Sequence, residues 1–159
     1  MVVTIMQSTL SIISKLKTDF SQFHFKESDD FFWSPIKKTV YYNPKIENAD
    51  ILLLHEIAHA LLGHSSFSSD ISLIILERQA WDRAIELGSA YDIKIVDGVA
   101  QYNLDSYRDW LHKRSTCPVC TATGLQTKKQ KYLCLACGNI WKVNLATKRR
   151  LHRYNLKLK

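Results

Sequence analysis

The sequence predicts an α+β fold with one hydrophobic core and a smaller, metal-held appendage. Apolar residues at helical spacing alternate with short aromatic and β-branched runs, which indicates a mixture of helices and strands. All four cysteines fall into two Cys-x-x-Cys pairs near the C-terminus. With 159 residues, 46% of them hydrophobic, the chain can bury a core of about 110 residues. We expect a main domain over 1–113, a cysteine module over 114–143 and a basic tail over 144–159.

The N-terminal segment 4–19 is predicted to form an amphipathic packing helix. Its apolar positions recur at helical spacing, with serine, lysine and threonine between them. These positions are Met6, Leu10, Ile13, Leu16 and Phe20. The segment is too short and too interrupted to span a bilayer, and it lacks a positive n-region and an Ala-x-Ala cleavage pattern. We therefore expect no membrane association and an intracellular, cytoplasmic protein.

Two short strands are predicted next, at 31–33 and 39–42, before the Asn-Pro turn. Both runs are aromatic and β-branched, and Ser-Pro separates them. Pro35, Lys37 and Lys38 suit the edge of a sheet. An edge strand could offer backbone donors and acceptors to an extended peptide. The alternative is that these strands only close the core.

Residues 55–64 read HEIAHALLGH and contain the pattern His-Glu-x-x-His. On a helix, His55 and His59 share one face, so both imidazoles can bind one metal ion while Glu56 lies beside it. The apolar flanks indicate a buried helix, and buried imidazoles need partners that a divalent cation provides. We expect a catalytic Zn2+ here, with Glu56 as general base toward an attacking water. The corresponding reaction is peptide bond hydrolysis.

Histidine alone does not complete this site. A catalytic zinc usually takes three protein ligands, and no histidine lies between 65 and 111. His64 is expected to point away from His59, because Gly63 is positioned to end the helix. Leu62 and Ser65 also exclude the longer HExxHxxGxxH pattern. A carboxylate from another helix is therefore favoured.

The segment 69–87 is predicted to be that second helix. Asp70 or a nearby serine can cap its start, and Gly88 is expected to end it. Glu77 is the preferred third ligand, because a small alanine one turn further on lets two helices approach closely. The next candidates are Glu86 and Asp82. The remaining alternative is a glutamate that is solvated or ion-paired on an exposed face.

The motif HEIAHALLGH with a downstream Glu-x-x-Ala resembles the small gluzincin metallopeptidases of the ImmA/IrrE class over about residues 1–112. The resemblance implies a zincin-like domain built from an N-terminal helix, a short sheet, the HExxH helix, the glutamate helix and a closing helix. It implies His55, His59 and Glu77 as ligands and Glu56 as general base. It also implies an edge strand that aligns the substrate. The chain departs from the Glu-x-Glu-Ala-Asn often found in this class and has Glu-Arg-Gln-Ala-Trp instead.

A closing helix is predicted after Gly98. Apolar and aromatic residues recur there at helical spacing. They are Leu104, Tyr107, Trp110 and Leu111. We expect this helix to complete the domain.

Two cysteine pairs follow, separated by a polar, lysine-bearing stretch. Such pairs present four thiolates to one metal ion from two tight turns. A glycine after the second pair leaves the backbone free to donate hydrogen bonds to sulfur. The four predicted ligands of a structural Zn2+ ribbon are Cys117, Cys120, Cys134 and Cys137. Two disulfides would need an oxidising compartment, which the expected location disfavours.

SprT-like proteases, which act on DNA-bound proteins, also join HExxH to such a ribbon but use a third histidine.

Charge is distributed unevenly along the chain. Ten of the 22 Lys and Arg residues lie between 128 and 159, where there is no Asp or Glu, which leaves 12 basic against 15 acidic residues before it. The predicted contacts to nucleic acid phosphates are Lys148, Arg149, Arg150 and Arg153. Tyr132, Trp141 and Tyr154 are available to stack on bases. The alternatives are a solvated tail and docking on an acidic protein.

Taken together, these patterns predict an intracellular zinc endopeptidase acting on a protein or peptide substrate. The ribbon and the basic tail would recruit it to nucleic acid or to a protein bound there. The alternatives are a catalytically idle domain that serves as a binding module for nucleic acid or protein, and an SprT-like protease that acts on DNA-bound proteins.

Overall fold

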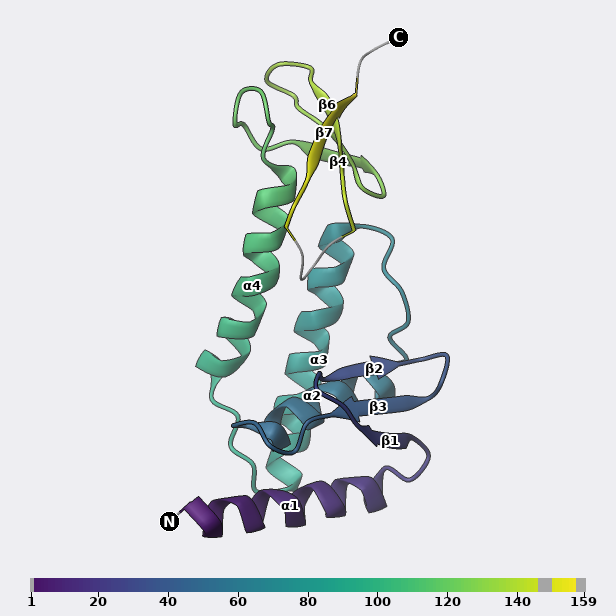
Figure 1. Cartoon of the computed structure of the whole chain (residues 1–159), viewed down its shortest axis with the longest axis vertical. Coiled ribbons are helices and arrows are strands. Elements are labelled where there is room, and N and C mark those ends of the chain that lie inside the picture. Colours follow the sequence, from purple (N-terminus) through teal and green to yellow (C-terminus); the bar gives the residue numbers. More distant parts are fainter. Residues whose placement is uncertain (1, 146–149, 157–159) are drawn as a thin grey trace. The chain divides into compact units, whose positions relative to one another are not determined.

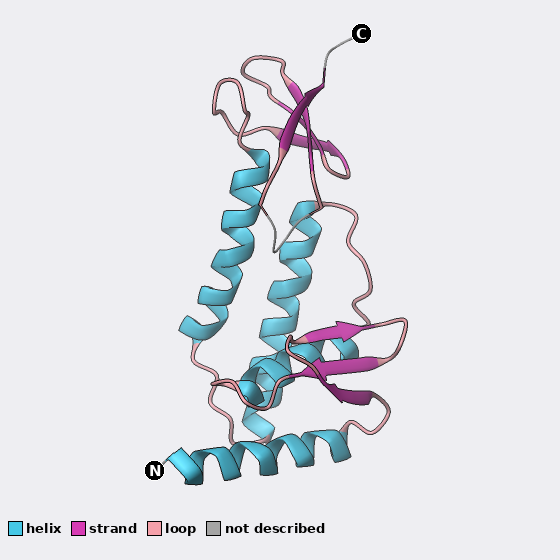
Figure 2. Ribbon diagram, in the orientation of Figure 1, coloured by secondary structure: helices cyan, strands magenta, loops and turns pink. Residues whose placement is uncertain are grey.

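The computed structural model describes residues 2–145 and 150–156 and shows an α+β fold (Figures 1 and 2). The helices are α1 (Val2–Asp19), α2 (Ala49–Leu61), α3 (Asp70–Ala90) and α4 (Asp97–Ser115). The strands are β1 (His24–Glu27), β2 (Phe32–Ser34), β3 (Thr39–Tyr42), β4 (Leu125–Lys128), β5 (Lys131–Leu133), β6 (Ile140–Val143) and β7 (Arg153–Leu156). None of the described helices is both long and apolar enough to cross a membrane.

The chain divides into two compact units, and each unit draws on two segments of the chain. Unit 1 comprises Met1–Ser66 and Leu76–Ala100, and unit 2 comprises Phe67–Ile75 and Gln101–Lys159. The chain therefore passes between the units three times: after Ser66, within α3 and within α4. The boundaries at 113/114 and 143/144 stay predictions.

Unit 1 is built on a three-stranded sheet with the order β1-β3-β2. Strand β1 pairs parallel to β3, and β2 pairs antiparallel to it as an edge strand. Helix α2 packs on β3 and β2, and α1 contacts α2. The side chains at the centre of this core are fully buried: Leu16, Val40, Leu53, Leu54 and Ile57. Strand β1 was not predicted from the sequence. Only one of its four residues, an aromatic one, faces inward, so the strand shows no alternation of apolar and polar residues.

Helix α2 is bounded by two residues in the left-handed conformation. Asn48, with φ of 57°, precedes it, and Gly63, with φ of 67°, follows it. Glycine adopts this conformation without steric cost, so it turns the chain sharply after the last helical turn. The His64 backbone N–H then donates to the His59 carbonyl oxygen at 3.0 Å. This turn directs the chain back toward the helix it has just left.

Helix α3 begins as predicted but extends further. The Ser72 backbone N–H donates to the Ser69 hydroxyl at 3.1 Å, which caps the helix start. The prediction that Gly88 ends the helix is wrong, since α3 continues to Ala90. Gly88 is needed for packing instead, because a Cβ there would lie 2.6 Å from the Ile93 carbonyl oxygen.

Unit 2 contains an antiparallel sheet with the order β4-β5-β6-β7. One face of this sheet covers a small core of Cys117, Tyr132, Cys134, Trp141 and Val143. The expected tail starts at 144, whereas Arg153–Leu156 pairs with β6 and forms the fourth strand of the sheet.

A buried ion pair fixes the start of α3 within unit 2. Arg114 donates from Nε to the Asp70 carboxylate at 2.5 Å, and the Tyr132 hydroxyl donates to the same carboxylate. Gln126 accepts from the Asp70 backbone N–H at 2.8 Å. Asp70 is 2% exposed and Arg114 1% exposed, so this pair is shielded from water and depends on its hydrogen bonds.

Candidate active site and metal centres

Three side chains from α2 and α3 converge on one point in unit 1. His55 and His59 lie one turn apart on α2, and Glu77 reaches them from α3. The His55 Nε2 lies 3.2 Å from the Glu77 Oε2 and 3.1 Å from the His59 Nε2. The His59 Nε2 lies 3.5 Å from the same carboxylate oxygen. All three side chains are buried.

The spacing of these three atoms matches the ligand set of a small tetrahedral cation. Nitrogen and oxygen ligands about 2.0–2.1 Å from zinc are about 3.3 Å apart at tetrahedral angles. The three observed separations of 3.1, 3.2 and 3.5 Å scatter around that value. When both rings carry their proton on Nδ1, the two Nε2 atoms that face each other at 3.1 Å present lone pairs that a cation would stabilise. The residues present therefore fit a zinc ion.

The pKa values of Glu77 and His59 are shifted by their neighbours at this centre. Burial raises the pKa of Glu77, but the hydrogen bonds and charges of His55 and His59 outweigh it and lower this pKa to about 2. Burial lowers the pKa of His59, but the hydrogen bond and charge of Glu77 raise it overall. Glu77 is therefore ionised at neutral pH, as a metal ligand must be.

Glu56 lies between the two histidines in sequence and faces strand β2. Burial raises its pKa above the usual range, while the charges of the two histidines act in the opposite direction. The backbone N–H of Trp33 donates to the Glu56 carboxylate. Trp33 belongs to β2, one of the two edge strands of the sheet. This edge strand and the half-buried Glu56 carboxylate are therefore neighbours.

His64 does not point away from His59, so that expectation is wrong. The two Nδ1 atoms are 2.8 Å apart, and the His64 side chain also hydrogen bonds with Gln79. The Trp33 indole Nε1 donates to the His64 carbonyl oxygen at 3.0 Å. The sequence feature that could have predicted this position of His64 is Gly63, because the glycine ends the helix and also reverses the chain. His64 contacts the outer nitrogen of His59, not the point where the three ligands meet.

His55 is held by packing. Its ring stacks on the indole of Trp81, with the ring centroids 4.2 Å apart and the planes 27° from parallel. Its Nδ1 is buried with no hydrogen bond partner among the described residues. Since Trp81 is 2% exposed, the stack fixes the ring plane from inside the core.

The other two carboxylates considered as third ligands lie elsewhere. Glu86 is exposed and accepts a hydrogen bond from Arg83 at 2.7 Å. Asp82 is exposed and pairs with Arg78 at 3.7 Å. Glu77 alone of the three shares a buried cluster with the two histidines.

The four cysteines of unit 2 also come together. The Sγ atoms of Cys117 and Cys137 are 3.7 Å apart, and those of Cys120 and Cys134 are 3.4 Å apart. Sulfur ligands about 2.3 Å from zinc are about 3.8 Å apart at tetrahedral angles. Burial raises the pKa of the Cys117 thiol, but backbone N–H groups of the same turn outweigh it and lower this pKa to about 6. The four thiols therefore fit one zinc ion.

The basic residues predicted to contact nucleic acid are only partly described. Arg153 donates from Nη1 to the Thr116 carbonyl oxygen at 3.0 Å, and Arg150 is exposed. Lys148 and Arg149 lie outside the described residues. Two of the three aromatic residues considered for base stacking are buried, Tyr132 at 1% and Trp141 at 0% exposure, so that expectation was wrong for them. Tyr154 is 54% exposed.

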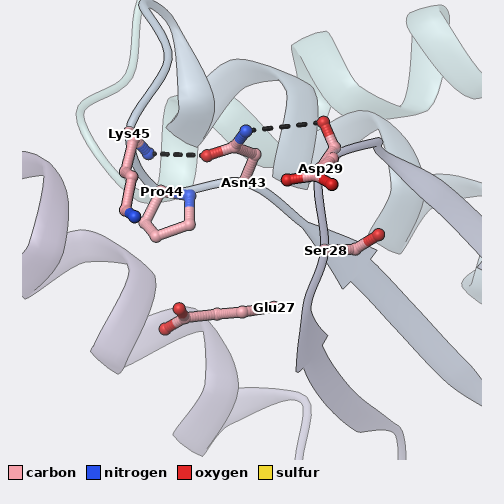
Figure 3. A pocket seen from close by; sticks show the side chains of 6 residues that line it. All are labelled: Glu27, Ser28, Asp29, Asn43, Pro44 and Lys45. Atoms are coloured by element: carbon pink, nitrogen blue, oxygen red, sulfur yellow. Dashed lines mark hydrogen bonds between the residues drawn. The ribbon is translucent and has the colours of Figure 1, made fainter.

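The surface of unit 1 has cavities in the part of the chain that the structure describes. One, of about 500 Å³, borders the candidate active site through His64. Its lining residues are Leu62, His64, Leu76, Gln79, Asp82, Arg83 and Glu86. Another, of about 360 Å³, lies where β1 and β3 end, and its polar lining is internally hydrogen bonded between Asn43 and its neighbours Asp29 and Lys45 (Figure 3).

Comparison with known proteins found no match for this chain among family models, curated proteins or solved structures. The functional argument therefore depends on the residues and geometry described above.

Proposed function

We propose that this chain is a zinc-dependent endopeptidase with a zincin-like active site in unit 1. The observation that carries the proposal is the buried convergence of His55, His59 and Glu77 at separations suited to tetrahedral zinc. Zinc bound there would supply a Lewis acid that polarises a carbonyl group and makes a water molecule acidic. That chemistry is the hydrolysis of a peptide bond.

Glu56 is the general base in this proposal. Its carboxylate lies beside the ligand pair on α2, where it can accept the proton of an attacking water and pass it to the leaving amine. Burial raises its pKa above the usual range of a glutamate, which makes the carboxylate a stronger base. The nearby Trp33 N–H acts in the opposite direction and lowers this pKa.

Strand β2 is the proposed site for the substrate backbone. It is an edge strand, and Trp33 lies on it next to Glu56. An extended peptide that pairs with such an edge would lie alongside the reacting groups, with recognition largely independent of side chains.

Unit 2 is proposed to bind a second zinc ion through its four cysteines. The small core beneath the sheet cannot by itself supply much stability, so metal binding would contribute a large part of the folding free energy. Cysteine ligands of this kind persist in a reducing compartment, so this proposal agrees with the expected intracellular location.

The direct test is cleavage of a denatured protein by the purified chain with one equivalent of zinc per site. Glu56→Gln should abolish cleavage while zinc content is unchanged, because Glu56 does not bind the metal. Glu86→Gln is the matched control, since Glu86 is an exposed glutamate paired with Arg83, and it should cleave at the wild-type rate. Cleavage by Glu56→Gln at the wild-type rate would contradict the mechanism.

A further inference from the structure

The four strands of unit 2 align a row of basic residues on one face of their sheet. Lys128 lies directly opposite Lys131, Lys131 opposite Lys142, and Lys142 opposite Tyr154. Residues directly opposite each other in a sheet project from the same face. We call this row, together with His152, the lysine face; its members are Lys128, Lys131, Lys142, His152 and Tyr154.

The lysine face is opposite to the face that covers the core. Tyr132, Trp141 and Val143 are buried, and they alternate along their strands with Lys131 and Lys142. Lys128, Lys142, His152 and Tyr154 are exposed and Lys131 is half-buried. Arg153 lies between His152 and Tyr154 in the chain, and it donates to the Thr116 carbonyl oxygen. Accessible lysines therefore lie on this sheet face, which is not the face that covers the core.

Positive charge on this face is not compensated within the sheet. Like charges directly opposite each other on neighbouring strands are destabilising. None of the ion pairs found across residues 2–145 and 150–156 includes Lys128, Lys131 or Lys142. The sequence has no Asp or Glu after Asp109. An arrangement that costs stability and lacks an internal partner indicates an anionic ligand.

Two aromatic rings lie at the end of the row. His152 and Tyr154 are two residues apart on the same side of the chain, with ring centroids 6.1 Å apart and planes 20° from parallel. Tyr154 is 54% exposed. Exposed, near-parallel rings beside basic residues are the arrangement on which unpaired bases stack. Bases inside a duplex are not accessible to such rings.

We propose that the lysine face binds single-stranded nucleic acid, with the lysines on the phosphates and Tyr154 under a base. An anionic membrane is a less suitable partner, because it would need exposed apolar side chains beside the lysines. The apolar row next to the lysine face is largely covered. In that row Leu125 is 57% exposed, whereas Leu133, Ile140 and Leu156 are half-buried. This inference does not depend on peptidase activity.

The test is binding of the full chain to a short fluorescent single-stranded DNA, followed by anisotropy over a series of salt concentrations. Lys131→Gln/Lys142→Gln should weaken binding and reduce the slope of log K against log salt by about 1.4, since each phosphate contact on a single strand contributes about 0.7. The matched control Lys94→Gln/Lys113→Gln removes two exposed lysines from elsewhere and should leave the slope unchanged. Equal losses in both double variants would overturn the proposal.

Tyr154 tests base stacking separately from charge. Tyr154→Ala should weaken binding about fivefold or more with an unchanged salt slope, and Tyr154→Trp should retain it. Circular dichroism and the thermal midpoint identify any variant that fails to fold. Wild-type affinity in Tyr154→Ala would overturn the stacking role. Binding of phosphatidylserine vesicles instead of DNA, lost in Lys131→Gln/Lys142→Gln, would show that the partner class is wrong.

Discussion

The Nδ1 atoms of His59 and His64 lie 2.8 Å apart, so one of these two nitrogens donates a hydrogen bond to the other. The Nε2 of His59 faces His55 and Glu77. If His59 carries its proton on Nδ1, its Nε2 lone pair is free to bind a metal, and His64 is the acceptor that fixes this tautomer. Gln79 in turn orients His64.

His64→Ala should therefore weaken zinc binding at the histidine site by about 10–100-fold, because the loss of a group that orients a ligand typically costs that much. His64→Gln should restore most of the affinity, since its amide oxygen can accept the same hydrogen bond. Competition with a chromophoric chelator measures the affinity. His112→Ala, which removes an exposed histidine on α4, is the control, and an equal effect there would exclude a local role for His64.

Metal content separates the two centres. Wild-type protein should contain two zinc ions, and Glu77→Ala and Cys134→Ser should each contain about one, because each variant removes a ligand from one site only. Elemental analysis after gel filtration gives the count. Glu86→Ala should keep both ions, since Glu86 pairs with Arg83. Two ions in Glu77→Ala would show that the third ligand is wrong.

The buried pair of Asp70 and Arg114 should contribute to the stability of unit 2 alongside the proposed metal site. Arg114→Met leaves the Asp70 carboxylate buried beside Tyr132 without its cation, which typically costs about 3–5 kcal/mol. Adding Asp70→Asn to that variant should recover part of the loss. Urea unfolding followed by circular dichroism measures the difference. Arg78→Met breaks an exposed pair and should change stability by less than about 1 kcal/mol.

Gly124 has the closest neighbours of the five glycines. A Cβ there would lie 2.2 Å from the Trp141 ring and 3.0 Å from the Leu133 carbonyl oxygen. Gly124→Ala should destabilise unit 2 by about 1–3 kcal/mol, because the buried indole cannot move without strain. Thermal unfolding tests this. Gly98→Ala meets nothing within 4 Å and should be neutral or stabilising by about 0.4–1 kcal/mol; a loss equal to that of Gly124→Ala would contradict the packing argument.

Features that depend on local periodicity could be predicted from the sequence. The α+β class, the helix that carries His55 and His59, and the two cysteine turns follow from spacings of a few residues, where chain geometry alone decides which side chains share a face. The start of α3 near a serine cap is local in the same sense.

Features that depend on contacts between distant segments needed the tertiary structure. The sequence left Glu77, Asp82 and Glu86 as candidate ligands, and only the packing of α3 against α2 in unit 1 brings Glu77 to the histidines. The return of His64 to His59 depends on the turn at Gly63. Strand register likewise decides which basic residues of the sheet face solvent. Neighbouring residues on a strand point to opposite faces of the sheet, and the pairing of the strands determines which of the two faces is buried.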